Sequence, residues 1–164
     1  MRCFHRLLLV SSLLTASLAA TAGTVTVSFV DPDQYWDAGT LSADEGPNLR
    51  ALAGHLQRLG QTQLRADQTL AIEVLQIALA GTRARAAGAS FRTLVGGADW
   101  PRIEVRYTLQ TPGQPALSGR EWVVDMDYLR GLSGARASET LYYEKRMLSG
   151  WFKARFADRQ PAPG

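Results

Sequence analysis

The sequence predicts an α+β fold in which a mostly antiparallel sheet of four to five strands carries two helices packed on one face. Several short segments alternate apolar and polar residues, which is typical of strands with one buried face. Two longer segments repeat apolar residues every three or four positions, which is typical of amphipathic helices. The expected order is β-α-β-(β)-β-β-α, and no repeat or charge block divides it. We therefore expect one domain at residues 23–164.

The N-terminal segment, residues 1–22, is expected to be a signal peptide outside the fold. Arg2 and Arg6 give it a basic start, residues 7–18 form a short apolar run, and Ala-Thr-Ala at 20–22 fits the pattern of a cleavage site. The run is too short and too rich in serine for a comfortable bilayer span. We therefore expect an exported, periplasmic protein that is not stably inserted in a membrane.

Charge and cysteine content exclude several classes of protein once the leader is removed. The chain has 18 basic and 15 acidic residues, and loss of Arg2 and Arg6 leaves 16 basic residues, a net charge of about +1. A nucleic-acid partner is not expected, because binding to phosphates needs a clustered positive field. The one cysteine, Cys3, lies in the leader, so disulfides, thiolate metal sites and cysteine nucleophiles are excluded from residues 23–164. We expect no cofactor.

The N-terminal part of the domain is predicted to contain a strand followed by a helix. Residues 24–29 alternate valine and phenylalanine with small polar residues, and this strand is expected to stop at Asp31. A long polar connection at 33–47 follows. Apolar residues then recur with helical spacing at 47–59, and Gly60 is expected to end that helix.

Further strands are predicted in the middle of the chain. Residues 70–79 alternate with a slip of one residue, which indicates a bulge or a strand covered on both faces. Residues 81–89 are expected to form a loop or a ragged helical turn, and residues 91–95 a short strand. The segments 102–109 and 117–126 then alternate cleanly across a turn, which predicts an antiparallel hairpin with one solvated face.

The last element is predicted to be a second helix that Ser138 can cap. Its apolar stripe should be the largest single stabilising contact, and Gly150 should lie on the opposite, solvated side. We expect the tail at 158–164 to be disordered. The stripe consists of Leu141, Leu148, Phe152 and Phe156, with Trp151 on its flank.

Several stretches of the chain also resemble a known bacterial family. The most distinctive are ADWPRI at 98–103 and YYEKRML at 142–148, and further stretches lie at 24–39, 72–81 and 125–129. Together they resemble the family called domain of unknown function 3016, whose members are small exported proteins of Gram-negative bacteria. The resemblance implies a periplasmic location. It supplies no activity, cofactor or catalytic residue.

Aromatic residues beside acidic ones form the first candidate site. Tyr35 and Trp36 follow the first strand, and Asp99 and Trp100 precede a later one. Aromatic side chains in or beside loops can form a stacking platform for a sugar, a peptide or a proline of a partner protein. The alternative is that these large side chains cap the end of the core.

An acidic segment forms a second candidate site, for a metal ion. Asp31, Asp33 and Asp37 crowd one stretch of chain, and a hard cation such as calcium prefers several carboxylate oxygens. Their spacing lacks the alternating ligands and central glycine of a calcium loop. The alternative is a solvated turn, in which Asp and Pro are ordinary residues.

A pair of aspartates forms a third candidate site, for catalysis. Asp125 and Asp127 at the end of a strand can act as acid and base of a glycoside hydrolase, with Glu144 and Lys145 on the last helix nearby. The structural alternative places both aspartates in a turn and pairs the helix residues with strand arginines, Arg102 or Arg106.

His55, the one histidine beyond the leader, is the remaining candidate, as a general base. It lies at the border of an apolar helical stripe. The simpler interpretation packs its ring on the edge of the core, with one nitrogen reaching water. No nucleophile motif accompanies it.

We therefore expect a non-catalytic periplasmic domain that acts by binding. Its expected partner is another envelope protein or a small ligand, at the loop end that carries Tyr35, Trp36, Asp99 and Trp100. The alternative is a carboxylate-dependent hydrolase of an envelope polymer. Such an enzyme needs a cleft in which two acids converge and one keeps its proton near neutral pH. A binding domain needs an exposed aromatic or apolar patch with a polar rim.

Overall fold

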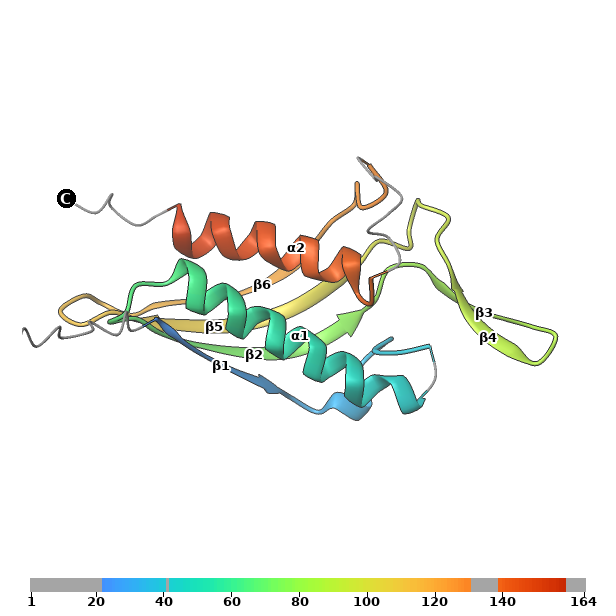
Figure 1. Cartoon of the computed structure of the whole chain (residues 1–164), viewed down its shortest axis with the longest axis horizontal. Coiled ribbons are helices and arrows are strands. Elements are labelled where there is room, and N and C mark those ends of the chain that lie inside the picture. The colour runs from blue at the N-terminus through green and yellow to red at the C-terminus, as the bar shows by residue number, and fades with distance from the viewer. Residues whose placement is uncertain (1–21, 41, 131–138, 159–164) are drawn as a thin grey trace, which may run out of the picture.

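The computed structural model describes residues 22–40, 42–130 and 139–158, and their fold is α+β, as predicted (Figure 1). The main sheet has four strands in the order β1-β2-β5-β6, and two helices lie side by side on one of its faces. The predicted leader before Ala22, the capping Ser138 and the tail beyond Asp158 lie outside the described residues. The strands are β1 (Thr24–Phe29), β2 (Thr69–Ala78), β5 (Arg102–Gln110) and β6 (Leu117–Val124), and the helices are α1 (Ser42–Gln63) and α2 (Tyr142–Phe152).

One pair of strands in the main sheet is parallel. Strand β1 runs beside β2 in the same direction, because α1 crosses over the sheet between them. The pairs β2–β5 and β5–β6 are antiparallel, and a short turn joins β5 to β6. In the described part of the chain, neither helix combines the length and the apolar character that crossing a bilayer requires.

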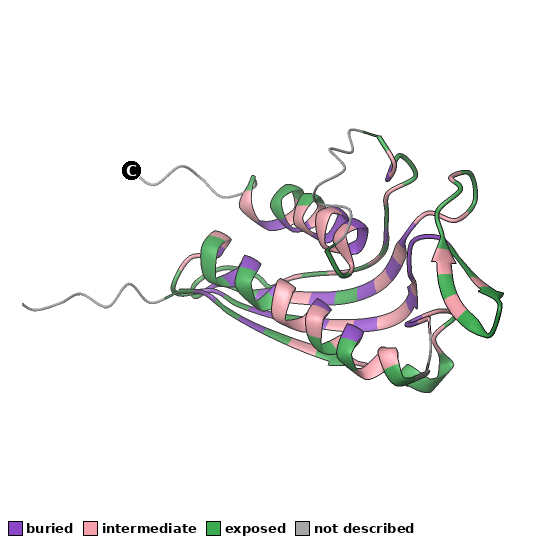
Figure 2. Cartoon of the chain, turned by 45° about the vertical axis from the view of Figure 1, so that its right-hand side comes forward, coloured by how far each residue is buried: buried purple, intermediate pink, exposed green. Residues whose placement is uncertain are grey.

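The core lies between the helices and the strand faces turned toward them, where Figure 2 shows the buried residues. Helix α2 contributes a stripe that includes Leu148 and Phe152, and a π-helical turn, η2 (Lys153–Ala157), continues it and adds Phe156. The rings of Phe152 and Phe156 meet edge to face at 5.0 Å, and Tyr107 of β5 meets Phe156 at 5.3 Å. Burial of each large side chain stabilises the fold by about 1.5–3 kcal/mol.

Strand β2 contains the predicted bulge. Its register with β5 shifts between Val74 and Gln76, so the residue between them, Leu75, has no paired neighbour in β5. Beyond this extra residue, the alternation of inward and outward side chains resumes one position later along the chain. Val74 and Ile77 are therefore both buried, although three positions separate them.

Helix α1 is longer at both ends than the sequence indicated. It begins at Ser42 rather than near 47, and it continues through Gly60 to Gln63. Gly60 is not a stop signal but a point of close approach, because a Cβ atom there would lie 2.1 Å from Cγ2 of Val25 in β1. The glycine lets the helix lie directly on the edge strand.

A hairpin that the sequence did not predict projects from the end of the main sheet (Figure 1). Strands β3 (Thr82–Ala86) and β4 (Ala89–Thr93) pair with each other in a separate two-stranded sheet. Residues 81–89 were expected to form a loop or helical turn, and that expectation is wrong. The turn residues Ala87 and Gly88 both have positive φ, 49° and 80°, as a two-residue hairpin turn requires. The hairpin lacks apolar alternation because neither of its faces is buried.

Candidate functional site

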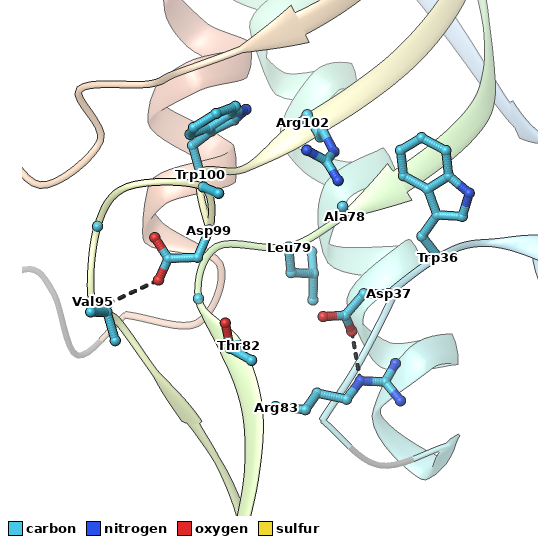
Figure 3. A pocket seen from close by; sticks show the side chains of 13 residues that line it. Trp36, Asp37, Ala78, Leu79, Thr82, Arg83, Val95, Asp99, Trp100 and Arg102 are labelled. Atoms are coloured by element: carbon cyan, nitrogen blue, oxygen red, sulfur yellow. Dashed lines mark hydrogen bonds and ion pairs between the residues drawn. The ribbon is translucent and has the colours of Figure 1, made fainter.

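A cavity of about 690 Å³ opens where the hairpin leaves the main sheet (Figure 3). Its walls come from the segment after β1, from the end of β2 and the start of β3, and from the segment that leads into β5. Three of the four residues predicted for a binding site, Trp36, Asp99 and Trp100, line it together. The charged side chains Asp37, Arg83 and Arg102 also line it.

Trp36 forms an exposed aromatic surface at one side of the cavity. Its side chain is 60% exposed, and its ring stacks on Trp122 with 5.3 Å between the ring centroids and 17° between the planes. Trp122 belongs to β6 and points away from the helices, since its neighbour Val123 is buried in the core. The stack therefore lies over the face of the sheet that no helix covers. Sequence reasoning missed Trp122 as a site residue because only the strand order brings it to Trp36.

Arg102 stands beside this stack. Its Cζ atom lies 5.0 Å from the centroid of the Trp36 ring, which is a cation–π arrangement. Its Nε atom is buried, and no acceptor among the described residues hydrogen-bonds to it. Figure 3 shows the guanidinium between Trp36 and Trp100. The structure therefore places the Trp36 ring beside Arg102, whereas the sequence had suggested a salt bridge between this arginine and the last helix.

Asp37 is held by two arginines from the hairpin. Its carboxylate accepts a hydrogen bond from Nε of Arg83 at 2.8 Å, and it pairs with both terminal nitrogens of Arg92 at 3.1 and 2.7 Å. Arg92 also donates to the backbone carbonyls of Leu79, Ala80 and Gly81, at 3.0, 2.8 and 2.8 Å. We call this group the Arg92 anchor, because it ties β4 to the end of β2.

The predicted cation site at Asp31, Asp33 and Asp37 is not formed. Within the described residues, no three His, Cys, Asp or Glu side chains lie close enough together to hold a metal ion. Asp31 and Asp33 stay exposed at a short 3₁₀ turn, η1 (Pro32–Gln34). Asp37 is carried away from them, because the chain rejoins the sheet beside Ala78 of β2 and turns the carboxylate toward the arginines.

Asp99 and Trp100 form the opposite wall. Asp99 accepts hydrogen bonds from the hydroxyl of Tyr128 at 2.8 Å and from the backbone N–H of Val95 at 2.9 Å. Burial, together with the Asp99 carboxylate, raises the pKa of Tyr128 to about 12. Trp100 is half-buried and packs on a small second core that includes Tyr128 and Tyr143. It therefore caps that core while it lines the cavity.

Tyr35, the fourth predicted binding residue, lies elsewhere. Its hydroxyl donates to the carbonyl of Val74 at 2.8 Å, and its ring packs against the main core. Burial raises its pKa to about 12. Tyr35 is a core residue, because successive residues of this extended segment point to opposite faces of the sheet.

The acids proposed for catalysis have separate arginine partners. Asp125 accepts a hydrogen bond from Arg146 at 2.7 Å, and Asp127 lies 3.2 Å from Arg130. Neither acid lines the cavity beside Trp36. The structure therefore joins Asp125 to α2 by an ion pair, and it leaves Asp127 in the turn that follows β6.

Glu144 is buried and does not form the expected salt bridge to Arg102 or Arg106. It is 3% exposed, and its Oε1 accepts the backbone N–H of Ala80 at 2.6 Å. Burial raises the pKa of this carboxyl, while the Ala80 N–H and the nearby Arg92 act to lower it. Arg106 pairs instead with Glu73 on the uncovered face of the sheet, and Lys145 pairs with Glu139. Glu144 therefore ties α2 to the end of β2.

His55 lies between the two helices. Its Nε2 is 2.9 Å from both the carbonyl of Lys145 and the hydroxyl of Ser149. Burial lowers its pKa, which favours the neutral ring. These contacts join α1 to α2, as expected for a residue at the edge of the core, and they engage one of the two ring nitrogens.

Comparison with the curated proteins found no significant match, and comparison with the solved structures found none either. A family described as "Protein of unknown function (DUF3016)" matches residues 23–154. The match begins at the first residue after the predicted leader and includes both distinctive stretches and the residues that line the cavity. The chain therefore belongs to the DUF3016 family, as its sequence had suggested.

Proposed function

We propose that this protein is a non-catalytic binding domain of the periplasm, and that its cavity holds a small ligand or a segment of an envelope partner. One observation carries the proposal. An exposed tryptophan, Trp36, and Arg102, which pairs with no carboxylate among the described residues, stand together at a cavity of about 690 Å³. Aromatic surfaces with a few polar groups are typical of binding sites.

The acids at this cavity support binding over hydrolysis. A glycoside hydrolase needs one carboxyl group that gives a proton and a second that attacks or activates water. Here Asp37 is bound by Arg83 and Arg92, and Asp99 accepts hydrogen bonds from Tyr128 and Val95. Both carboxylates are thus engaged within the protein.

Binding at this cavity can be tested with the protein isolated from periplasmic extract. We expect native mass spectrometry to find a bound small molecule, or co-purification to find a specific companion protein. Trp36→Ala should remove either one. Phe91→Ala is the matched control, since Phe91 is also an exposed aromatic residue but lies on the hairpin and does not line the cavity. Loss in both variants, or in neither, would contradict the proposed site.

The proposed location has its own test. If the leader is removed as expected, N-terminal sequencing of protein from the periplasmic fraction should begin at Gly23. Recovery of the protein from the cytosol with residues 1–22 still attached would contradict a periplasmic function.

A further inference from the structure

We propose that the ligand of this cavity presents a carboxylate group, which pairs with the guanidinium of Arg102, while an apolar part of the ligand lies against Trp36. This inference rests on the proposed binding function, and it names the chemical class of the ligand. The ligand is thus a monoanion with an apolar body.

The state of Arg102 is the first reason. A guanidinium has five N–H donors in a flat fork, and its natural partner is a carboxylate held by two parallel hydrogen bonds. In the described part of the chain, the Arg102 side chain has no such partner, and its buried Nε has no acceptor. The Nε atom itself is shielded from solvent, so a ligand carboxylate would pair with the terminal nitrogens of this guanidinium, whose side chain lines the cavity.

The orientation of Arg102 is the second reason. The ring of Trp36 lies 5.0 Å from its Cζ atom, and Trp122 supports that ring from the neighbouring strand. A guanidinium held on an aromatic face loses little freedom when it binds, and its planar fork stays available. The same ring offers an exposed apolar surface next to the charge.

The charge balance of the cavity is the third reason. Arg83 and Arg92 both pair with Asp37, and Arg83 also lies 3.9 Å from Glu45. These two arginines are thus balanced by two carboxylates. Asp99 lies on the opposite wall and accepts hydrogen bonds from Tyr128 and Val95. Among the described residues, Arg102 is therefore the cavity-lining arginine that pairs with no carboxylate, and its one positive charge suits a single carboxylate.

The neighbouring acid on β5 does not cancel this charge. Glu104 lies two residues from Arg102 on the same face of the sheet, and it accepts a hydrogen bond from Arg120 at 2.9 Å. Its negative charge is thus balanced by Arg120 of β6. Glu73, further along the same face, is likewise paired with Arg106.

The test uses two small probes of the same shape, phenylacetate and its neutral amide. The mature protein labelled with ¹⁵N gives a separate indole N–H signal for each of its four tryptophans, so NMR titration shows where a probe binds. We expect phenylacetate to shift the Trp36 signal and to bind roughly ten times more tightly than the amide, because a charge-assisted hydrogen bond is lost with the charge.

Two variants make the test specific. Arg102→Gln should remove the preference for phenylacetate, and Arg102→Lys should keep only part of it because the flat fork is lost. Arg106→Gln is the matched control, since it removes an arginine from the same strand and the same face but not from the cavity. It should leave the preference unchanged.

The outcomes separate this inference from the binding function. If the amide binds as tightly as phenylacetate, or if neither probe shifts the Trp36 signal, the carboxylate inference is wrong. The binding function is tested separately, by the molecules that co-purify with the protein. A second pair of probes distinguishes two sources of a carboxylate, a peptide C-terminus and a sugar acid. N-acetyl-alanyl-alanine and glucuronate would each be compared with its own amide, and tighter binding of either acid supports the inference.

Discussion

The main sheet and the projecting hairpin of this protein are held in place by different forces. The main sheet buries one face under two helices, and residues such as Leu70 and Phe152 are fully buried there. The hairpin β3–β4 buries none of its residues, and Phe91 on it is 44% exposed. In the described part of the chain, its side-chain hydrogen bonds and ion pairs to other elements come from Arg83 and Arg92, and most of them belong to the Arg92 anchor.

This difference predicts two levels of stability in one chain. An isolated two-stranded hairpin is only marginally stable in water. The anchor, rather than packing, must therefore keep the hairpin in place, and local opening should occur more readily there than in the sheet. The comparison also concerns the cavity, because Asp37 belongs both to the cavity wall and to the anchor.

The largest expected effect is from a cavity made in the core. Phe152→Ala should lower the free energy of unfolding by about 3–5 kcal/mol, because it removes a fully buried ring. Phe91→Ala on the hairpin is the control, and it should change the free energy by no more than about 0.5 kcal/mol. Urea denaturation followed by tryptophan fluorescence measures both. Similar losses in the two variants would contradict the proposed difference between the regions.

A second comparison uses two glycines in helices. Gly60→Ala should destabilise the protein by about 1–3 kcal/mol, since its new methyl group would overlap Val25 of β1. Gly150→Ala should instead stabilise it by about 0.5–1 kcal/mol, because no atom of the described residues lies within 4 Å of the new methyl group and alanine favours the helix. Thermal denaturation of both variants measures whether each substitution stabilises or destabilises the protein. Stabilisation by both would show that α1 does not rest tightly on the edge strand.

The anchor can be broken without breaking the core. Arg92→Met should speed hydrogen exchange in β3 and β4 by roughly tenfold or more, since charged hydrogen bonds of about 1.5–3 kcal/mol are lost. Exchange in β2 and β5 should change much less. Arg85→Met is the matched control, because Arg85 is exposed on the same hairpin. Equal acceleration in both sheets would mean that the hairpin and the core open together.

A smaller effect concerns pH. Burial raises the folded-state pKa of Glu144 above its ordinary value of 4.5, so folding favours the protonated form. The stability that this group contributes is greatest below pH 4.5 and falls as pH rises through the folded-state pKa. Compared with the wild type, Glu144→Gln should therefore gain relative stability as the pH rises above 4.5. A stability difference that stays constant as the pH rises would show that the raised pKa is absent.

The sequence was sufficient to predict the elements that have one buried face. Strands β5 and β6, the bulge in β2 and the stripe of α2 all follow from apolar spacing, because burial imposes that spacing. The hairpin escaped prediction for the same physical reason, since residues exposed on both sides carry no periodic signal. Its turn used Ala87 and Gly88 instead of the more familiar Asn-Gly.

The candidate site was only partly predictable. Trp36, Asp99 and Trp100 drew attention as aromatic and acidic residues near strand ends, and the structure places them around one cavity. Arg102 was assigned to a solvated strand face, and Trp122 was grouped with Val124 and Met126 on one face of its strand, so nothing local marks either residue as a partner of Trp36. Their meeting depends on which strands are neighbours, and strand order is a long-range property of the fold.

The bulge in β2 also determines where the length of this chain can change. If β2 continued through Leu75 without a bulge, Ile77 and Leu79 would turn outward and Gln76 would turn inward beneath the helices. Val74 and Gln76 already pair with consecutive residues of β5, so removal of Leu75 alone would leave a regular strand with the same side chains facing the helices. At the hairpin tip, where nothing approaches Gly88, the chain is free to lengthen or shorten.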